Sequence, residues 1–270
     1  MDIIKTIGSE TKYTFHSHTQ FCDGRASMEE FAQAAVKAGF MHYGFSPHSP
    51  VPIASPCNMS LESVDAYLRE VDAIRQRYGD KVNFYAGMEI DYLGSDWGPS
   101  QEYFQSLALD YRIGSVHFIP DKRGEMIDID GNAVRFLINM SKHFDNDIHY
   151  VVETFYNESC AMVEAGGFDI IGHFDKIAQN ASAFRPEIEQ EQWYQDLVGQ
   201  LISLICDKKI IVEINTKSKV AHDRIFPSEH YLKTLVDAGV PIIVNSDAHE
   251  PALIDASRQY AFDVLKALKS

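Results

Sequence analysis

Short apolar runs alternate along the chain with longer stretches in which apolar positions recur every three or four residues. The short runs are mostly unbroken, which is typical of strands buried on both faces of a sheet. The longer stretches have the spacing of amphipathic helices. Seven strands are predicted at residues 12–16, 42–46, 82–92, 111–118, 168–174, 210–216 and 241–247. Helices are predicted at residues 27–38, 60–77, 99–107, 131–143, 147–165, 190–207 and 228–238, and from about 251 onward.

This alternation of strands and helices predicts an α/β fold with a parallel sheet. Parallel neighbours need a crossover connection, and a helix usually supplies it. The strand count fits an open doubly wound sheet and a closed barrel equally well. Because no internal repeat or linker rich in Pro, Gly or Ser divides the 270 residues, we expect one domain over 1–270.

The composition excludes several classes of partner. A net charge of −15 makes binding to nucleic acid or to an anionic membrane surface unfavourable. No apolar run is long enough for a membrane helix, and the first residues lack the apolar core of a signal peptide, so a cytoplasmic protein is predicted. The four cysteines are too far apart for a zinc knuckle or a C-x-x-C redox motif, which favours free thiols. The sequence does not indicate the oligomeric state.

Ionisable residues follow the apolar run at almost every predicted strand end. A lone histidine there is more often a packing or surface residue, but six of the seven strand ends carry a histidine or a carboxylate. In a parallel barrel these ends meet at one rim, where active sites lie. Imidazole and carboxylate are common metal ligands, so their convergence favours a site for several metal ions. These candidate ligands are His16, His18, His48, Glu89, His117, His173, Asp247 and His249.

The short motifs around these residues occur in a specific order. They read H-x-H-T followed by D-G, then G-F-S-x-H, G-x-E-I-D-Y, G-S-V-H, I-I-G-H-F-D and S-D-A-H, and they extend from residue 12 to about 250. This ordered set closely resembles the PHP superfamily (polymerase and histidinol phosphatase), and within it the histidinol-phosphate phosphatase branch. The resemblance implies a distorted, TIM-like (β/α)7 barrel with a metal site at the C-terminal face of the strands.

The resemblance also implies three divalent metal ions, whose ligands carry over residue by residue. The ligands are His16, His18, Glu89 and Asp247 for the first ion, Glu89 as a bridge with His117 and His173 for the second, and His48 and His249 for the third. Mixed nitrogen and oxygen ligands accept zinc, iron or manganese, so the sequence leaves the metal open.

The third metal site departs from the pattern of many phosphatase relatives. Their additional histidine would align with Gly24 of this chain. Asp23, one position earlier, matches the acid that other members use, and we expect it to be the substitute ligand. A weakened third site is the alternative.

Three divalent ions and three carboxylates would leave the pocket about three charge units positive, which suits a phosphate monoester dianion. Neighbouring metal ions activate water at neutral pH and hold phosphoryl oxygens during in-line attack. We therefore expect a phosphoric monoester hydrolase with a small-molecule substrate. The branch implies hydrolysis of L-histidinol phosphate in histidine biosynthesis. Asp247 and His249 are the candidates for catalytic assistance to the leaving alkoxide.

Substrate contacts are expected from the long loop after the sixth strand, because it lies on the same rim. The candidates for phosphate or amine contacts are Asn215, Lys217, Arg224 and Ser228, and the weaker ones are Lys176, Arg112 and His222.

Three other interpretations remain. A member of the superfamily could act on another small phosphate ester, on a phosphodiester or as a nuclease, although the negative charge disfavours long nucleic acid. A metal-binding module without catalysis would be expected to have lost ligands. The stretch D-x-D-G at Asp128 resembles the start of haloacid-dehalogenase phosphatases, but it lacks the strong apolar strand that should precede it.

Overall fold

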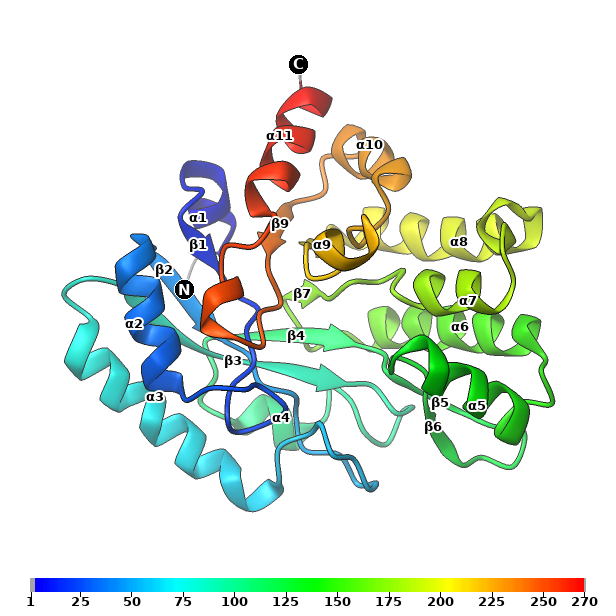
Figure 1. Cartoon of the computed structure of the whole chain (residues 1–270), viewed down its shortest axis with the longest axis horizontal. Helices are drawn as coiled ribbons and strands as arrows, with labels where there is room; N and C mark the ends of the chain where they lie inside the picture. Colours follow the sequence, from blue (N-terminus) through cyan, green and yellow to red (C-terminus); the bar gives the residue numbers. More distant parts are fainter. Residues whose placement is uncertain (1–2, 270) are drawn as a thin grey trace.

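Seven parallel strands form a sheet that curves into a nearly closed barrel (Figure 1). The structure is a computed structural model that describes residues 3–269. The strands lie in chain order around the sheet, and all hydrogen-bonded neighbours are parallel. Their bounds are β1 (Tyr13–Thr14), β2 (His42–Phe45), β3 (Asn83–Asp91), β4 (Tyr111–Ser115), β7 (Ile170–Ile171), β8 (Ile211–Asn215) and β9 (Ile242–Asn245). The predicted (β/α)7 barrel is confirmed, and each of its strands lies within a predicted one.

Helices cover the outside of the sheet (Figure 1). They are α1 (Ile3–Ser9), α2 (Met28–Ala38), α3 (Val64–Tyr78), α4 (Glu102–Ser106), α5 (Ala133–His143), α6 (Ile148–Ala165), α7 (Ile177–Phe184), α8 (Gln192–Lys208), α9 (Lys219–His222), α10 (Glu229–Asp237) and α11 (Arg258–Lys269). Helix α2 begins with a capping box, because the Ser27 hydroxyl accepts from the backbone amide of Glu30 while the Glu30 carboxylate accepts from the backbone amide of Ser27.

The structure adds elements that the sequence pattern did not predict. The helices α1, α7 and α9 are short, and residues 251–253 form a separate 3₁₀ turn before α11. An antiparallel hairpin of β5 (Phe118–Pro120) and β6 (Met126–Asp128) follows β4. Asp128 therefore ends a short hairpin strand outside the parallel sheet, which contradicts the haloacid-dehalogenase interpretation.

The inward face of each strand changes character along its length. On β8, Ile211 belongs to the apolar floor of the barrel, whereas Glu213 and Asn215 follow at two-residue intervals toward the carboxyl end. On β4, Ile113 is likewise followed by Ser115. Successive side chains alternate between faces, so one strand fills the barrel near its start and supplies polar groups near its end. The residues between them, such as Ile214, pack outward against the helices.

Tyr111 fills the middle of the barrel and requires two glycines. Its hydroxyl donates to the carbonyl oxygen of Phe15 at 2.6 Å. A Cβ atom on Gly44 or Gly87 would lie 2.2 or 2.1 Å from atoms of the Tyr111 side chain. The two strands approach this ring so closely that no side chain larger than hydrogen fits.

The barrel closes between β1 and β9 through side chains and through a backbone bridge between Ser17 and Ala248, just beyond the two strands. The Phe15 amide donates to Oδ1 of Asn245 at 2.8 Å, and the Val244 amide donates to the Tyr13 hydroxyl at 3.2 Å. The buried Arg258 guanidinium of α11 donates to the carbonyl oxygen of Tyr13 and lies 3.4 Å from that of Val244. This region, called the seam below, joins residues from both ends of the chain.

Two further expectations can be compared with the structure. None of the helices in residues 3–269 combines the length and apolarity required to cross a bilayer. The four cysteines, Cys22, Cys57, Cys160 and Cys206, are all free thiols, as predicted.

Candidate metal centre

The nine side chains predicted as metal ligands all lie together at the carboxyl ends of the strands. In overlapping groups of three or four, their ligand atoms come within 4.8 Å of one another. Eight lie immediately after a strand or within its last residues, where the inward face has become polar, and Asp23 comes from the loop before α2. The residues are His16, His18, Asp23, His48, Glu89, His117, His173, Asp247 and His249.

Glu89 lies in the middle of this cluster, with histidine nitrogens around both carboxylate oxygens. Its Oε2 lies 3.2 Å from Nε2 of His16, 3.4 Å from Nε2 of His18 and 3.1 Å from Nδ1 of His48, and its Oε1 lies 3.4 Å from Nε2 of His117 and 2.9 Å from Nε2 of His173. A single fully buried carboxylate therefore faces both halves of the cluster. This is the position that a bridging ligand requires.

Four buried polar atoms of the cluster have no hydrogen-bond partner within residues 3–269. They are Nε2 of His16, Oδ1 of Asp23, Nδ1 of His48 and Oε2 of Glu89. A buried polar atom without a partner is costly, and native proteins rarely leave one unsatisfied. Unpaired imidazole and carboxylate atoms that face a common space fit bound divalent cations, so the residues present suit the metals that the sequence implies.

Two carboxylates that were not predicted as site residues orient the histidines. Nδ1 of His16 donates to Oε1 of Glu213 at 2.6 Å, and Nδ1 of His117 donates to Oδ1 of Asp91 at 2.6 Å. Each bond leaves Nε2 of the imidazole directed at the cluster, as is usual for metal-bound histidines. The sequence signal was the two-residue spacing between Asp91 and Glu89 on β3, which places both on the inward face.

The buried carboxylates strongly change the ionisation of the histidines. Burial alone would lower the pKa of His16, but Glu213 and Glu89 outweigh it and raise this pKa well above its ordinary value. Burial is outweighed in the same way at His117, where Asp91 and Glu89 raise the pKa to about 9. His18 differs, because burial and its histidine neighbours lower its pKa. In the metal-free protein, protons on His16 and His117 therefore provide the positive charge that the carboxylates require.

Asp23 occupies the position expected of the substitute third-site ligand. Its Oδ1 lies 3.3 Å from Nε2 of His249, 3.6 Å from Nδ1 of His18 and 3.9 Å from Nε2 of His48. A Cβ atom on Gly24 would lie only 2.3 Å from the backbone of His18. This backbone therefore cannot accommodate a histidine at position 24, and the acid one position earlier reaches the cluster instead.

The candidate catalytic residues Asp247 and His249 lie beside a lysine. Oδ1 of Asp247 is 3.1 Å from Nε2 of His18. Oδ2 of Asp247 accepts a hydrogen bond from the side-chain amide of Asn215 at 3.0 Å. Nζ of Lys217 lies 3.4 Å from Oδ1 of Asp247 and 3.2 Å from Nε2 of His249. Lys217 is thus the cation nearest to the cluster on this side.

The four candidate substrate residues divide into two pairs. Lys217 lines the pocket, and Asn215 supports Asp247 from below. The side chains of Arg224 and Ser228 are not brought to the pocket. Arg224 pairs with Glu189, and the Ser228 amide donates to the buried carboxylate of Asp175 at 2.7 Å. These contacts fold the loop back onto the barrel wall, which a linear sequence could not indicate.

The three weaker candidates for substrate contact lie in different places relative to the pocket. Nζ of Lys176 is held by Oδ2 of Asp130 at 2.6 Å, at the edge of the pocket. Arg112 donates to the carbonyl oxygen of Phe104 and is not brought to the pocket. His222 lines a second cavity that continues from the cluster.

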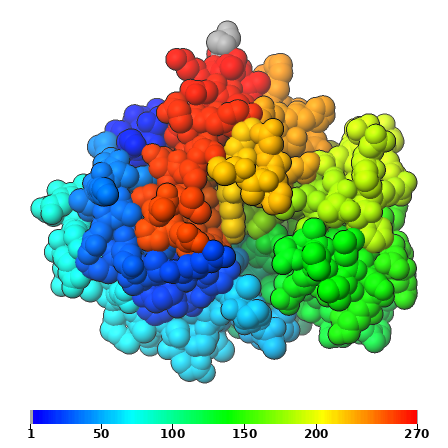
Figure 2. Space-filling view, in the orientation of Figure 1, coloured from blue at the N-terminus to red at the C-terminus, as the bar shows by residue number. Residues whose placement is uncertain are grey.

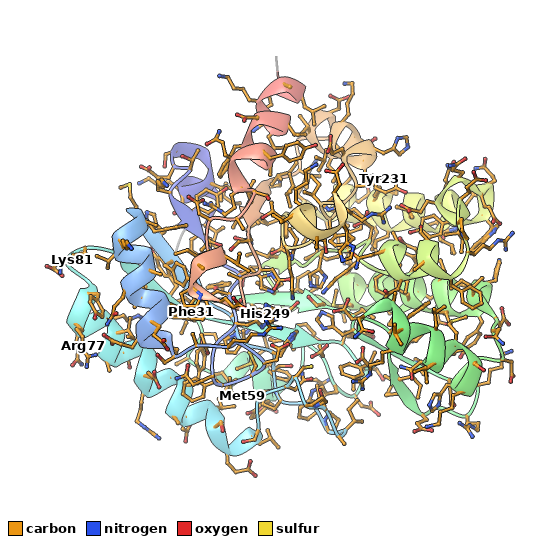
Figure 3. All side chains as sticks on the ribbon, viewed as in Figure 1. Phe31, Met59, Arg77, Lys81, Tyr231 and His249 are labelled. Atoms are coloured by element: carbon orange, nitrogen blue, oxygen red, sulfur yellow. The ribbon has the colours of Figure 1, made fainter. Side chains whose placement is uncertain are left out.

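The pocket next to the cluster has a volume of about 220 Å³. Figure 2 shows a hollow between the blue N-terminal loop, the gold segment after β8 and the green segment after β4. These segments line the pocket together with the loop after β2 and His249. In Figure 3, His249 lies near the middle of the molecule, whereas Tyr231 lies away from it on α10. Two larger cavities, of about 470 and 710 Å³, share lining residues with this pocket. Together they give a small ligand access to the cluster.

The sequence model of the PHP domain matches residues 14–217, which include most of the cluster. The chain belongs to the PHP domain family. Among curated proteins, this PHP chain is 26% identical to the "Probable histidinol-phosphatase" of Schizosaccharomyces pombe over 87% of this chain and 80% of that protein. It is 22% identical to the histidinol-phosphatase of Bacillus subtilis over 87% of this chain and 92% of that protein.

Solved structures support the barrel of this PHP chain. A protein from Listeria monocytogenes assigned as a histidinol phosphatase superposes with a TM-score of 0.79 at 17% identity, covering 93% of this chain and 99% of that one. The histidinol phosphate phosphatase of Lactococcus lactis, solved with zinc, L-histidinol and phosphate, superposes with a TM-score of 0.70 at 16% identity, covering 96% and 94%. At these identities the likeness establishes the fold alone.

Proposed function

We propose that this PHP protein is a metal-dependent phosphatase that hydrolyses L-histidinol phosphate to L-histidinol and phosphate. The enzyme class, a phosphoric monoester hydrolase, follows from family membership together with the histidinol-phosphatase relatives. The choice of substrate and of three metal ions, zinc, iron or manganese, is our proposal. It is supported by relatives of modest identity and by a donor set large enough for three ions.

One observation carries the proposal: eight potential metal-ligand side chains cluster around the buried carboxylate of Glu89, next to an open pocket. When bound, divalent metals would supply Lewis acidity toward phosphoryl oxygens and a nucleophile at neutral pH. His16, His18, Glu89 and Asp247 would hold the first ion, Glu89 with His117 and His173 the second, and Asp23, His48 and His249 the third.

The remaining groups have roles that their positions support. Lys217 places a positive charge between Asp247 and His249, where it would bind a phosphate oxygen of the substrate. Asn215 donates to Asp247 and fixes the orientation of this carboxylate. Glu213 and Asp91 hold the histidines in the tautomer that presents Nε2 to the metals. Asp247 and His249 remain our candidates for catalytic assistance to the leaving alkoxide.

The first test measures phosphate release from L-histidinol phosphate by the metal-loaded enzyme, beside a panel of other phosphate esters. We expect a kcat/KM near or above about 10⁴ M⁻¹s⁻¹ and well ahead of the panel. Slow turnover of histidinol phosphate with rapid hydrolysis of another ester would overturn the substrate and retain the metal mechanism. No hydrolysis of any ester would overturn the proposed function.

The site assignment is tested with His16→Ala and His117→Ala. Both variants should lose bound metal and activity while keeping the circular dichroism spectrum of the barrel. His149→Ala is the matched control, because this histidine is exposed on α6 and far from the cluster in sequence and contacts. Retained activity in both cluster variants would contradict the assignment.

A further inference from the structure

The pocket beside the metal centre contains two carboxylate side chains that the proposed function does not use. Apart from the predicted metal ligands, the acidic and basic side chains that line it in the described chain are Asp128, Asp130 and Lys217. Lys217 belongs to the segment after β8, whereas the two aspartates belong to the segment that starts at the β5–β6 hairpin (Figure 2). A phosphate held by the metals and Lys217 would leave the rest of the substrate facing acidic groups.

The two aspartates differ in how far their charges are already neutralised. Oδ2 of Asp130 accepts from the largely buried Lys176 at 2.6 Å, so this carboxylate has a close counter-ion. Oδ2 of Asp128 is 3.5 Å from Nε of Arg135, whose side chain is 53% exposed. A solvent-exposed pair at that distance is weak. Asp128 is therefore the carboxylate on this wall whose charge is available to a ligand.

Asp128 is also held in a fixed position. Its Oδ1 accepts from the backbone amides of Asp130 and Gly131, at 2.9 and 3.2 Å, in the turn that ends the hairpin. A carboxylate has about four lone-pair sites, so these contacts and Arg135 leave room for another donor. A preorganised acceptor in a partly enclosed pocket forms a stronger charge-assisted hydrogen bond than a mobile surface group does.

The location of Asp128 determines which part of the substrate this carboxylate can contact. Asp128 and Phe118 line both the pocket at the metal centre and the adjoining cavity of about 470 Å³. A leaving alcohol that extends from the phosphate toward this larger cavity passes an aromatic side chain and a carboxylate on one wall, because Phe118 and Asp128 are partners in the β5–β6 ladder. That combination suits an organic cation. Arg135, Lys142 and His143 also line the larger cavity, so Asp128 would bind a cation where the two spaces join.

We propose that Asp128 is a specificity-determining residue that binds a protonated nitrogen of the leaving alcohol. The enzyme would then select phosphomonoesters with a cationic alcohol over neutral or anionic ones. This inference rests on the proposed phosphatase activity and adds to it a residue that distinguishes leaving alcohols by their charge. The cationic nitrogen can be an amine or an imidazolium, and the choice of substrates separates the two.

The test compares three small esters with the metal-loaded enzyme: 2-aminoethyl phosphate, 2-(imidazol-4-yl)ethyl phosphate and ethyl phosphate. Ethyl phosphate is the reference, because its leaving alcohol carries no charge. For the wild type we expect kcat/KM for at least one cationic ester to exceed that for ethyl phosphate by about tenfold or more. Asp128→Asn should reduce this ratio by about tenfold, because asparagine keeps an oxygen for the turn amides but has no charge.

Two variants control for general effects of charge and folding. Glu125→Gln removes the same charge from the same hairpin, but this residue lines only the adjoining cavity, so the ratio should change less than about twofold. Arg135→Gln removes the competing guanidinium and should raise the ratio.

Each outcome is decisive. A wild-type ratio near one, or a ratio that Asp128→Asn leaves unchanged, would overturn the role of Asp128 while the phosphatase activity stands. An equal fall in the ratio with Glu125→Gln would assign the selectivity to general charge and also overturn it. Failure of the wild type to hydrolyse any ester, histidinol phosphate included, would instead overturn the proposed function.

Discussion

At the scale of single residues, the metal centre consists of charges that must be balanced. Glu89, Glu213 and Asp247 are almost completely buried. Despite burial, the surrounding histidines lower the pKa values of Glu89 and Glu213, and Lys217 followed by His16 and His18 lowers that of Asp247. An isolated buried carboxylate would be strongly destabilising. Protons on the histidines and divalent metals are thus alternative ways to balance the same negative charge.

This competition gives a prediction for pH. Metal-free His117 keeps its additional proton up to about pH 9, whereas an imidazole nitrogen bound to a metal has none. Metal binding must therefore displace at least one proton below pH 9. Affinity should rise at least about tenfold per pH unit from pH 7 to 9, because His16 also holds a proton that metal binding displaces. The part of the rise that His117 causes should level off above pH 9. Manganese titrations across this range, with proton release measured in weakly buffered solution, check the slope.

Asp91→Asn is the variant that isolates this effect. Without the negative charge beside Nδ1, the pKa of His117 should fall, and the rise in affinity should level off at a lower pH. A slope that is zero between pH 7 and 9 in the wild type would contradict the proposed balance.

The sequence predicted the candidate metal ligands but not the carboxylates that orient the histidines among them. His117 and His173 could be predicted because each follows an apolar run that the strand pattern already identified. Glu213 and Asp91 lie within strands, where their roles depend on which face is inward and on which strand lies next to which. Asp91 belongs to the quoted motif of Glu89, at a two-residue spacing, but Glu213 belongs to no quoted motif. The histidine that each carboxylate orients is visible only with the sheet register.

At the scale of elements, the division between floor and rim of the barrel follows from alternation along each strand. The apolar positions near the strand starts predicted the parallel sheet correctly. The hairpin of β5 and β6 was missed because its turn, residues 121–125, is almost entirely polar and reads as a loop. The closure of the barrel depends on residues far apart in sequence, which no local pattern can reveal.

The seam supplies a prediction for stability. Arg258→Met removes the donor groups beside the buried carbonyl oxygens of Tyr13 and Val244 and leaves both oxygens without them. Each unsatisfied buried group costs about 1–3 kcal/mol, so we expect a loss of about 2–4 kcal/mol in the free energy of unfolding. Urea denaturation of the metal-free protein measures it.

Lys12→Gln provides the control for the seam. Lys12 pairs with Asp255 at 3.2 Å, and both side chains are exposed, so loss of this pair should cost less than about 1 kcal/mol. If Arg258→Met were no more destabilising than Lys12→Gln, the carbonyl contacts would not stabilise the closed barrel.

At the scale of the whole molecule, the predicted metal ligands extend from His16 to His249 and connect every part of the barrel. Metals that bind the folded state alone stabilise it by about 4 kcal/mol at a thousandfold excess over Kd. For a domain of this size that corresponds to roughly 8 °C in Tm. Thermal unfolding before and after chelation, with metal added back, measures the shift. An unchanged Tm would contradict metal binding by residues from both ends of the chain.

The fold class and the position of the site could be predicted because strands alternate with helices and candidate metal ligands lie at the carboxyl ends of six of the seven strands. The arrangement of the loop after β8 could not, since Arg224 and Ser228 are directed by Glu189 and Asp175 and not by the substrate pocket. Loop residues of suitable chemistry are common, and packing decides which of them face the pocket.

The closure of the barrel between its first and last strands also has a consequence during synthesis. His16 and His18 leave the ribosome early, but Asp247 and His249 follow more than two hundred residues later. Until then the early histidines lack the carboxylate and imidazole that complete their sites, and β1 lacks the neighbour that covers it. A chain that stops short of residue 247 therefore cannot assemble the complete centre, so full metal loading marks molecules whose translation has passed that point.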